Sequence, residues 1–201
     1  MNKAKMTGKP ETRQLLLETT LQLIETEGIK QVTIRKISAR AGVNLAAVSY
    51  HFGSKEQIIF AALQILRTSF AEAYKNLQAP TLAPRDRLVA FMTAYCDTVF
   101  AYPSLVKAFI THTLNANLEQ EYADFVRTEG MALITQTLAE FYPGDEETLR
   151  MKAFQMMSSL ILILLVGQET GAVIGLNFAD AEMRARYIQV VVPIDLPSRM
   201  R

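Results

Sequence analysis

The side chains best suited to binding another molecule are concentrated in one short segment, residues 35–55. Groups that can hydrogen-bond to bases or phosphates lie in its second half, at Asn44, Ser49, Tyr50 and His51. Cations that can pair with phosphates flank them, at Arg35, Lys36 and Lys55. Between the polar groups, Ala46 and Ala47 carry almost no side chain. This combination is typical of a surface that binds nucleic acid; a small helical subdomain whose basic residues merely face water is the alternative.

Two short helical patterns position these residues. Thr33 can cap the first, in which residues 34, 37, 38 and 41 share one face. Gly42 supplies the left-handed turn that stops it, and Asn44 can cap a second helix to about residue 51. Two helices joined through a glycine turn form a helix-turn-helix. Because the major groove of B-DNA is about 12 Å wide and admits one α-helix, the small Ala46 and Ala47 meet a steric requirement.

Helical patterns also surround this motif. Leu16, Thr20, Leu23 and Ile24 form one stripe on a helix that ends near Gly28. The capping box Ser54-Lys55-Glu56-Gln57 opens a helix to about residue 77, whose first amides offer a further anion site. A linker bounded by Pro80 and Pro84 follows. Further helices are predicted at 85–101, 104–116, 119–141, 145–167 and 178–191, with a break at 171–175, and no segment alternates like a strand. We therefore predict an all-α fold of about nine helices.

The distribution of charge favours an anionic partner for the N-terminal part. Residues 1–56 contain nine Lys or Arg and five Glu, a net charge of +4, and the remainder carries −3. The N-terminus lacks the apolar run of a signal peptide, and the apolar segment 160–167 is shorter than the roughly 20 residues of a membrane span. The single cysteine, Cys96, excludes an internal disulfide and a cysteine-based metal cluster. We expect a soluble cytoplasmic protein without a cofactor or membrane contact.

Residues 12–63 resemble a known DNA-binding domain. The segments "TRQLLLETTLQLIETEG" and "VTIRKISARAGVNLAAVSYHFGSKEQI", continued by Phe60-Ala61-Ala62-Leu63, are similar to the TetR (tetracycline repressor) family of bacterial transcriptional regulators. The resemblance implies that Thr33, Arg35 and Lys55 hold phosphates. It also implies a recognition helix that contains Asn44, Ala46, Ala47, Ser49, Tyr50 and His51.

This chain departs from the family pattern at three places. Thr19-Thr20 stands where the family usually has two alanines, and Ser38 replaces another alanine; their hydroxyls can be buried by bonding the preceding helical turn. Ser49 replaces a frequent tyrosine and so removes one aromatic contact with DNA. Within the motif, Val48 and Phe52 are expected in the core. Tyr50 is either partly packed or a DNA contact, and His51 either a buried hydrogen-bonding group or a phosphate contact.

Composition shifts divide the chain into a flexible basic tail (1–10), the helix-turn-helix domain (11–56) and a helical body (57–201), with helix 54–77 as connector. In the body, "AFQMMSSLILILLVG" is apolar around most of its circumference and must be buried on nearly all sides. The resemblance implies that it pairs with "AEMRARYIQVVV" as a homodimer interface. The interface residues are predicted to be Leu160, Ile161, Leu164, Leu165 and Tyr187. Burial within one subunit is the alternative.

The family resemblance also implies a pocket in the body that binds a small effector. Apolar or amphipathic residues of the middle helices are candidates to line it, namely Phe91, Tyr95, Phe109, His112 and Met157. No cluster of buried charges indicates a charged effector, so a largely apolar molecule is expected. Each of these residues is equally explained as ordinary core.

Catalysis is disfavoured by the residues present. The two histidines, His51 and His112, form no metal-binding pair, and neither a phosphate-binding glycine loop nor a G-x-S-x-G motif occurs. The acidic run Asp145-Glu146-Glu147 is explained by the helix macrodipole. We therefore predict a ligand-responsive, homodimeric regulator, most simply a repressor, that binds a palindromic double-stranded DNA operator. The alternative is a helical module for small molecules or protein partners that retains the helix-turn-helix only as scaffold.

Overall fold

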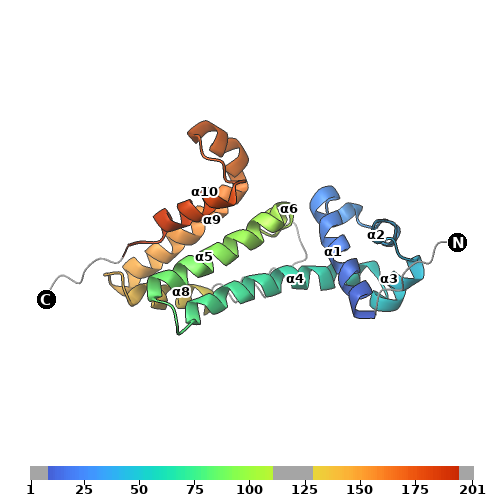
Figure 1. Ribbon diagram of the computed structural model, residues 1–201, viewed down its shortest axis with the longest axis horizontal. Coiled ribbons are helices and arrows are strands. Elements are labelled where there is room, and N and C mark those ends of the chain that lie inside the picture. The colour runs from blue at the N-terminus through green and yellow to red at the C-terminus, as the bar shows by residue number, and fades with distance from the viewer. Residues whose placement is uncertain (1–8, 111–128, 195–201) are drawn as a thin grey trace. The chain divides into compact units, whose positions relative to one another are not determined.

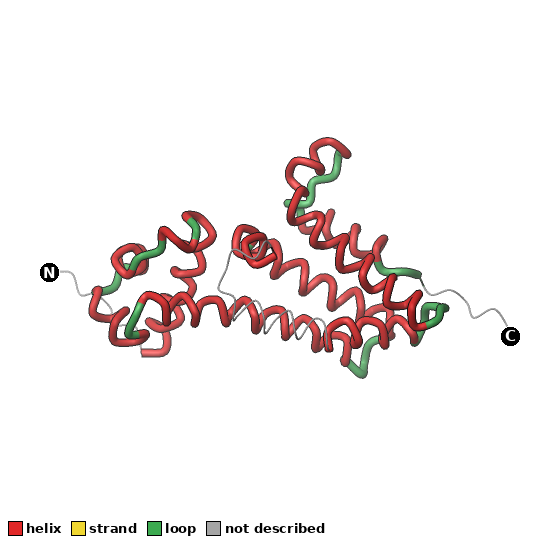
Figure 2. The backbone as a smooth tube through the Cα atoms, turned by 180° about the vertical axis from the view of Figure 1, so that it is seen from behind, coloured by secondary structure: helices red, strands yellow, loops and turns green. Residues whose placement is uncertain are grey.

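The computed structural model describes residues 9–110 and 129–194, with side chains throughout except at residue 9, 107–110 and 164–174. These ranges contain nine α-helices and no strand (Figures 1 and 2). The predicted all-α class is therefore confirmed. The chain divides into two compact units, one up to Arg67 and one from Thr68 onward. The boundary falls inside α4 (Lys55–Lys75).

The first unit is built around one apolar centre. Its elements are α1 (Lys9–Glu27), the short 3-10 helix η1 (Ile29–Gln31), α2 (Ile34–Ala41), α3 (Leu45–Phe52) and the start of α4. The predicted stripe of α1 faces inward, since Leu16, Thr20, Leu23 and Ile24 are all buried. Residues from the other elements, Val32, Ile37, Val48 and Ile58, complete this core at 0–1% exposure. The apolar pattern of the sequence therefore determines which face of each helix turns inward.

Hydroxyl groups in this core are satisfied locally. Thr20 is fully buried, and its Oγ1 donates a 2.7 Å hydrogen bond to the carbonyl of Leu16, four residues earlier. Ser38 Oγ donates to the carbonyl of Arg35 at 3.0 Å. Because each hydroxyl donates to a carbonyl of its own helix, both keep a hydrogen bond when they are buried. The expectation that these hydroxyls bond the preceding turn is confirmed for Thr20 and Ser38, and Thr19 is likewise buried, at 5% exposure.

The second unit is arranged around α5 (Pro84–Ala101), which packs against most other elements of the unit (Figure 1). Those elements are η2 (Asn76–Gln78), α6 (Pro103–Ile110), α8 (Met131–Ala139), α9 (Glu146–Ile174) and α10 (Ala181–Val191). The core contains fully buried Leu88, Phe91, Met92, Ile134, Leu138 and Met156. Cys96 of α5 is also buried, at 2% exposure.

α9 is longer than the sequence pattern predicts. Its predicted end at 167 is wrong, because the helix continues to Ile174. Gly175 then takes the left-handed conformation, with φ of 72°, that ends the helix. The break lies at the last residue of the predicted 171–175 region. The parts of the predicted helices at 111–116 and 119–128 lie outside the described residues.

Three arginines tie the helices of the second unit together. Arg87 of α5 donates a 2.9 Å bond to the carbonyl of Leu77 at the end of η2 and pairs with Glu140 after α8. Arg85, also on α5, donates to the carbonyl of Pro193 at 3.1 Å, just beyond α10. α5 is therefore linked to the connection before it and to the last helix of the unit.

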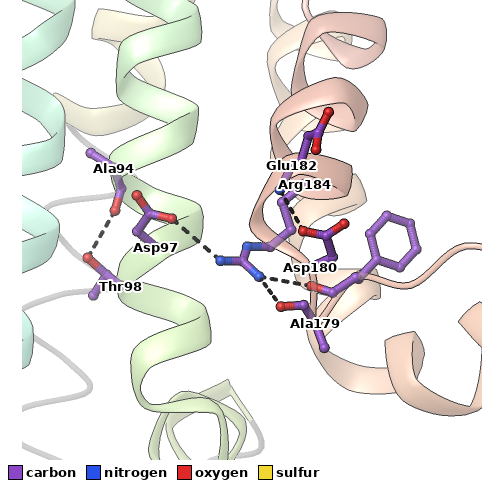
Figure 3. Close-up of polar contacts among 8 residues, drawn as sticks. Ala94, Asp97, Thr98, Ala179, Asp180, Glu182 and Arg184 are labelled. Atoms are coloured by element: carbon purple, nitrogen blue, oxygen red, sulfur yellow. Dashed lines mark hydrogen bonds and ion pairs between the residues drawn. The ribbon is translucent and has the colours of Figure 1, made fainter.

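Arg184 makes the third link, at the opposite end of α10 (Figure 3). Its Nη1 donates to the carbonyls of Phe178 and Ala179 at 3.0 and 2.9 Å, and its Nη2 lies 3.8 Å from a carboxylate oxygen of Asp97 on α5. The guanidinium carbon also lies 4.5 Å from the ring centre of Phe100. One planar group thereby joins the loop before α10 to the surface of α5.

Candidate nucleic-acid interface

The limits of α2 and the start of α3 are set by two side-chain caps and one glycine. Thr33 Oγ1 accepts from the amide of Lys36 at 3.2 Å and so caps α2. Gly42 takes φ 68° and ψ 27°, and its N–H bonds back to the carbonyls at the end of α2. Asn44 Oδ1 then accepts from the amide of Ala46 at 2.9 Å and caps α3. The predicted helix-turn-helix is confirmed, with its predicted capping residues in place.

α3 has one inward face and one outward face. Val48 and Phe52 are 1% and 7% exposed and pack into the core, as expected. The outward face contains Leu45, Ala46, Ser49 and Tyr50, all exposed, while Ala47 and His51 are partly covered. Ala46 in the first turn ends at Cβ, so the helix backbone can approach a partner closely at that residue, while the neighbouring Leu45 projects a side chain that is 46% exposed.

The aromatic side chains of α3 differ in exposure. Tyr50 is 69% exposed, so it is mainly a surface residue. The ring of His51 lies edge-on to that of Tyr50, with centroids 5.2 Å apart. Its partial exposure is compatible with a contact to a phosphate. Two aromatic groups with polar atoms therefore stand together at the end of the exposed face.

Cations surround this face, but they are not equivalent. Arg35 is exposed on α2, Thr33 is exposed beside it, and Lys55 is partly covered at the start of α4. Lys36, in contrast, has its Nζ 2.6 Å from Glu27 of α1. Lys36 is therefore already paired within the unit, and its expected role at a flanking phosphate needs this pair to open.

Arg13 of α1 is a cation that the sequence pattern did not single out. Its guanidinium carbon lies 5.1 Å from the ring centre of Phe52, the last residue of α3. Arg13 is itself exposed, so the charge stays accessible to water. The contact places a positive group over the C-terminal end of α3, where it also suits the negative end of the helix dipole. Arg13 and Phe52 are far apart in the sequence, so no local motif predicts their contact.

The start of α4 differs from the simple anion site that was expected. The amide of Gln57 donates to Ser54 Oγ at 3.2 Å, so it is already satisfied. The pKa of Glu56 is lowered because its carboxylate accepts from its own backbone N–H and from the Ser54 hydroxyl. An ionised carboxylate thus stands next to Lys55. The predicted capping by Ser54 is confirmed, and Lys55 provides the positive charge here.

Two of the candidate effector-binding residues come together in the second unit. Phe91 and Tyr95 are 0% and 6% exposed, with ring centroids 5.8 Å apart. Phe70 and Tyr74 extend this aromatic cluster, lying 4.7 Å from Tyr95 and Phe91 respectively. Met157 of α9 is also buried, at 7% exposure. Phe109, as a side chain, and His112 lie outside the described part of the chain.

The candidate dimer residues differ in how far they are exposed to solvent. Leu160 is 1% exposed and belongs to the core of its own subunit, so it cannot contact a partner as predicted. Ile161 and Tyr187 are partly exposed, and the side chains of Leu164 and Leu165 lie outside the described set. The sequence pattern missed a strongly exposed set on α9, namely Met151, Phe154 and Leu162, and Val190 on α10. The helical periodicity of α9 could have revealed the three residues of this helix, because they lie on the side opposite its buried residues.

Neither a metal-binding side-chain cluster nor a membrane-spanning helix occurs within the described ranges. No group of three or more His, Cys, Asp or Glu side chains is close enough there to hold a metal ion. No helix described in 9–110 or 129–194 has the length and hydrophobicity of a membrane span.

Known proteins share this sequence pattern and fold. The family model for bacterial regulatory proteins of the tetR family matches residues 16–62. The HTH-type transcriptional regulator BetI of Burkholderia mallei is 26% identical over 130 residues, which cover 64% of this chain and 67% of that protein. Its counterpart in Burkholderia thailandensis is 25% identical over the same length.

Solved structures extend the likeness to the whole chain. A TetR-like transcriptional regulator from Rhodococcus sp. RHA1 gives a TM-score of 0.67 at 14% identity and covers 90% of this chain and 93% of that one. The fatty acid degradation regulator FadR from Bacillus halodurans gives 0.62 at 15% identity and covers 98% and 100%. At these identities the likeness concerns the fold. Residues 16–62 therefore match the DNA-binding domain of the bacterial tetR family of transcriptional regulators, and the chain shares the fold of TetR-like regulators.

Proposed function

We propose that this regulator is a homodimeric repressor that binds a palindromic operator and releases it when a small apolar effector binds. The observation that supports this proposal most directly is the outward face of α3, which is exposed and held by the Asn44 cap. A helix of this kind fits the major groove, where its first residues approach base edges.

The roles of individual side chains follow from their positions. Thr33 and Arg35 at the start of α2, and Lys55 at the start of α4, bind backbone phosphates on either side of the groove. The recognition helix supplies the contacts within the groove, through Ala46, Ala47, Ser49, Tyr50 and His51, and Asn44 caps its first turn. Phosphate contacts fix the register of the helix, whereas contacts within the groove select the sequence.

Dimerisation uses the exposed apolar side chains of α9 and α10. Met151, Phe154 and Leu162 are 60%, 68% and 59% exposed and follow one side of α9 at helical spacing. Ile161 beside them and Tyr187 on α10 are partly exposed. A two-fold axis through this face pairs α9 and α10 with their copies in a four-helix arrangement. A palindromic operator then offers one half-site to each subunit, about one helical turn apart or slightly more.

The effector site is proposed near the aromatic cluster of Phe70, Tyr74, Phe91 and Tyr95. Aromatic rings and Met157 provide the apolar, adaptable surface that binds an uncharged organic molecule. Only a moderate effect on DNA binding is needed, since a coupling of about 1–3 kcal/mol changes operator affinity roughly 5- to 150-fold. The protein acts in the cytoplasm, where a bacterial chromosome lies, and its role requires no catalysis.

Selection of duplexes from a random pool by the full-length protein tests the proposal. We expect a palindromic consensus, with a duplex that carries one half-site binding roughly a hundredfold more weakly because the second contact is lost. Affinity for the selected duplex should fall steeply with KCl concentration, since bound phosphates release counterions. Equal retention of the selected and the random pool at every salt concentration would contradict sequence-specific binding.

A further inference from the structure

The recognition helix lacks the side chains that read most bases by hydrogen bonds. From Leu45 to Phe52 its sequence is LAAVSYHF, with no Arg, Lys, Asn, Gln, Asp or Glu. Bidentate contacts from Arg or Lys recognise guanine, those from Asn or Gln recognise adenine, and Asp or Glu accepts from cytosine. Direct readout by α3 must therefore depend mainly on something other than these paired hydrogen bonds.

Asn44, the amide residue just before the helix, is already engaged. Its Oδ1 accepts from the amide of Ala46 at 2.9 Å, which turns that oxygen toward the backbone of α3. Bidentate recognition of adenine requires both Oδ1 and Nδ2 to face the base edge. Asn44 would have to release its cap to do so. Capping, rather than adenine recognition, is consequently its main role.

Apolar groups occupy the place where base contacts are made. Leu45 is the first residue of α3 and is 46% exposed, although the core of the unit buries leucines almost completely. Exposed Ala46 lies next to it, and Ser49 lies one turn further along the same face. In the major groove the apolar feature of a base pair is the 5-methyl group of thymine.

We propose that Leu45, with Ala46 beside it, contacts thymine 5-methyl groups and thereby selects T·A over C·G at the base pair that faces the start of α3. This inference depends on the proposed operator binding and adds a residue that determines its specificity. It also explains an exposed leucine that is not part of the core.

Replacing thymine by deoxyuridine removes the methyl group and leaves every hydrogen-bonding atom of the base in place. The full-length protein is titrated with its selected operator and with duplexes in which a single thymine of one half-site is replaced at a time. One position should weaken binding about fourfold in Kd, the value expected for one buried methyl group. At that position, 5-methylcytosine paired with guanine should bind more tightly than cytosine paired with guanine.

Variants of the protein assign the effect to Leu45. Leu45→Ala should bind the thymine duplex about fourfold or more weakly and lose the discrimination between thymine and uracil at that position. Leu45→Met, which keeps an apolar side chain of similar size, should retain part of it. Leu15→Ala, the same substitution at an exposed leucine of α1, is the matched control and should retain the discrimination fully. Circular dichroism confirms that each variant is folded.

Three results would overturn the inference: selected half-sites without thymine at these positions, equal affinity for thymine and uracil throughout, or full discrimination in Leu45→Ala. If the proposed function itself fails, the selection yields no preferred duplex and therefore no operator in which to replace thymine. That result is distinct from the three results above, each of which requires an operator.

Discussion

At the scale of single residues, the start of α4 places two opposite charges side by side. Lys55 is the proposed phosphate contact, and the neighbouring Glu56 is held in its ionised form by its own backbone N–H and by the hydroxyl of Ser54, which lower its pKa. A phosphate that approaches here is attracted by one side chain and repelled by the next. The strength of binding at this point therefore reflects the difference between the two.

Lys55→Ala is expected to weaken binding to all duplexes by a similar factor, because a phosphate contact carries no sequence information. The slope of log affinity against log salt should become about two units shallower, one for the Lys55 of each subunit. Fluorescence anisotropy over a range of KCl concentrations measures both quantities. Lys75→Ala, at an exposed position of α4 in the second unit, is the matched control and should change neither. A loss confined to one operator sequence would contradict the phosphate role of Lys55.

Glu56→Gln is expected to have the opposite effect and strengthen binding to every duplex. Because its pKa is lowered, Glu56 stays ionised at pH values where an ordinary glutamate begins to be protonated. Mildly acidic pH therefore does not increase the DNA affinity of the parent protein in the way that Glu56→Gln does. The affinity ratio of variant to parent should therefore stay constant from pH 7 to pH 5 in anisotropy titrations. A ratio that falls toward one by pH 5 would show that the pKa of Glu56 is raised rather than lowered, because even an unperturbed glutamate stays mostly ionised at pH 5.

At the scale of helices, the starts are defined by side chains that can be recognised in the sequence. Asp145 begins α9 by accepting from the amide of Thr148 at 2.8 Å, and its pKa is lowered by hydrogen bonds from the Thr148 side chain and backbone. The ionised carboxylate also suits the positive end of the helix dipole. The acidic start of this long helix is thus explained by capping.

Asp145→Ala is expected to lower the thermal midpoint of unfolding at pH 7. Because the folded-state pKa of Asp145 is depressed, its stabilising effect is fully present above the unfolded value of about 3.9 and is lost as pH falls through the folded value. Differential scanning calorimetry should show the gap between parent and variant narrowing below about pH 4. Asp145→Asn keeps a capping oxygen but has no group that titrates at this position. The stability of the Asn variant should therefore lack the pH dependence that Asp145 contributes to the parent. A gap for Asp145→Ala that widens in acid would contradict this account.

Helix starts and buried faces could be predicted, whereas contacts between distant residues could not. Thr33, Gly42 and Asn44 act on partners two to four residues away, so their effect depends on local sequence. The ion pair of Lys36 with Glu27 joins two helices and has no local pattern. The end of α9 was misplaced for a related reason. Gly167 can be accommodated inside a helix, and the sequence does not show which of several glycines takes the left-handed conformation.

The candidate site shows the same division. The sequence sufficed to place Ala46 and Ser49 on an outward face, because Val48 and Phe52 are large and apolar and must turn inward. It did not suffice to find Leu45, since an apolar residue is assigned to the core unless its neighbours are known. Leu160 illustrates the reverse error, because a helix that is apolar all round does not reveal which side its own subunit covers.

At the scale of the whole molecule, the exposed apolar side of α9 is the feature that needs a partner. Met151, Phe154 and Leu162 are each more than half exposed in a single chain. Complete burial of such a side chain is worth about 1.5–3 kcal/mol, so covering several of them provides a substantial driving force for association. The proposed dimer covers them with the same residues of a second copy.

Phe154→Glu is expected to produce monomers, because two carboxylates would meet close to the two-fold axis. Light scattering should show the mass of one chain, and affinity for the palindromic operator should fall toward that of a single half-site. Lys75→Glu introduces the same side chain on α4 and should remain dimeric. A Phe154→Glu protein that stays a dimer at micromolar concentration would place the interface on another surface.

The burial of Cys96 makes the chain's single thiol a reporter of its own unfolding. The side chain is 2% exposed, and burial raises its pKa to about 11, so at neutral pH it is a protected thiol rather than a reactive thiolate. A thiol reagent can modify it only when α5 separates from its neighbours. The rate of labelling therefore measures how often the second unit opens. An effector that binds this unit should slow the labelling, and more effector should slow it further.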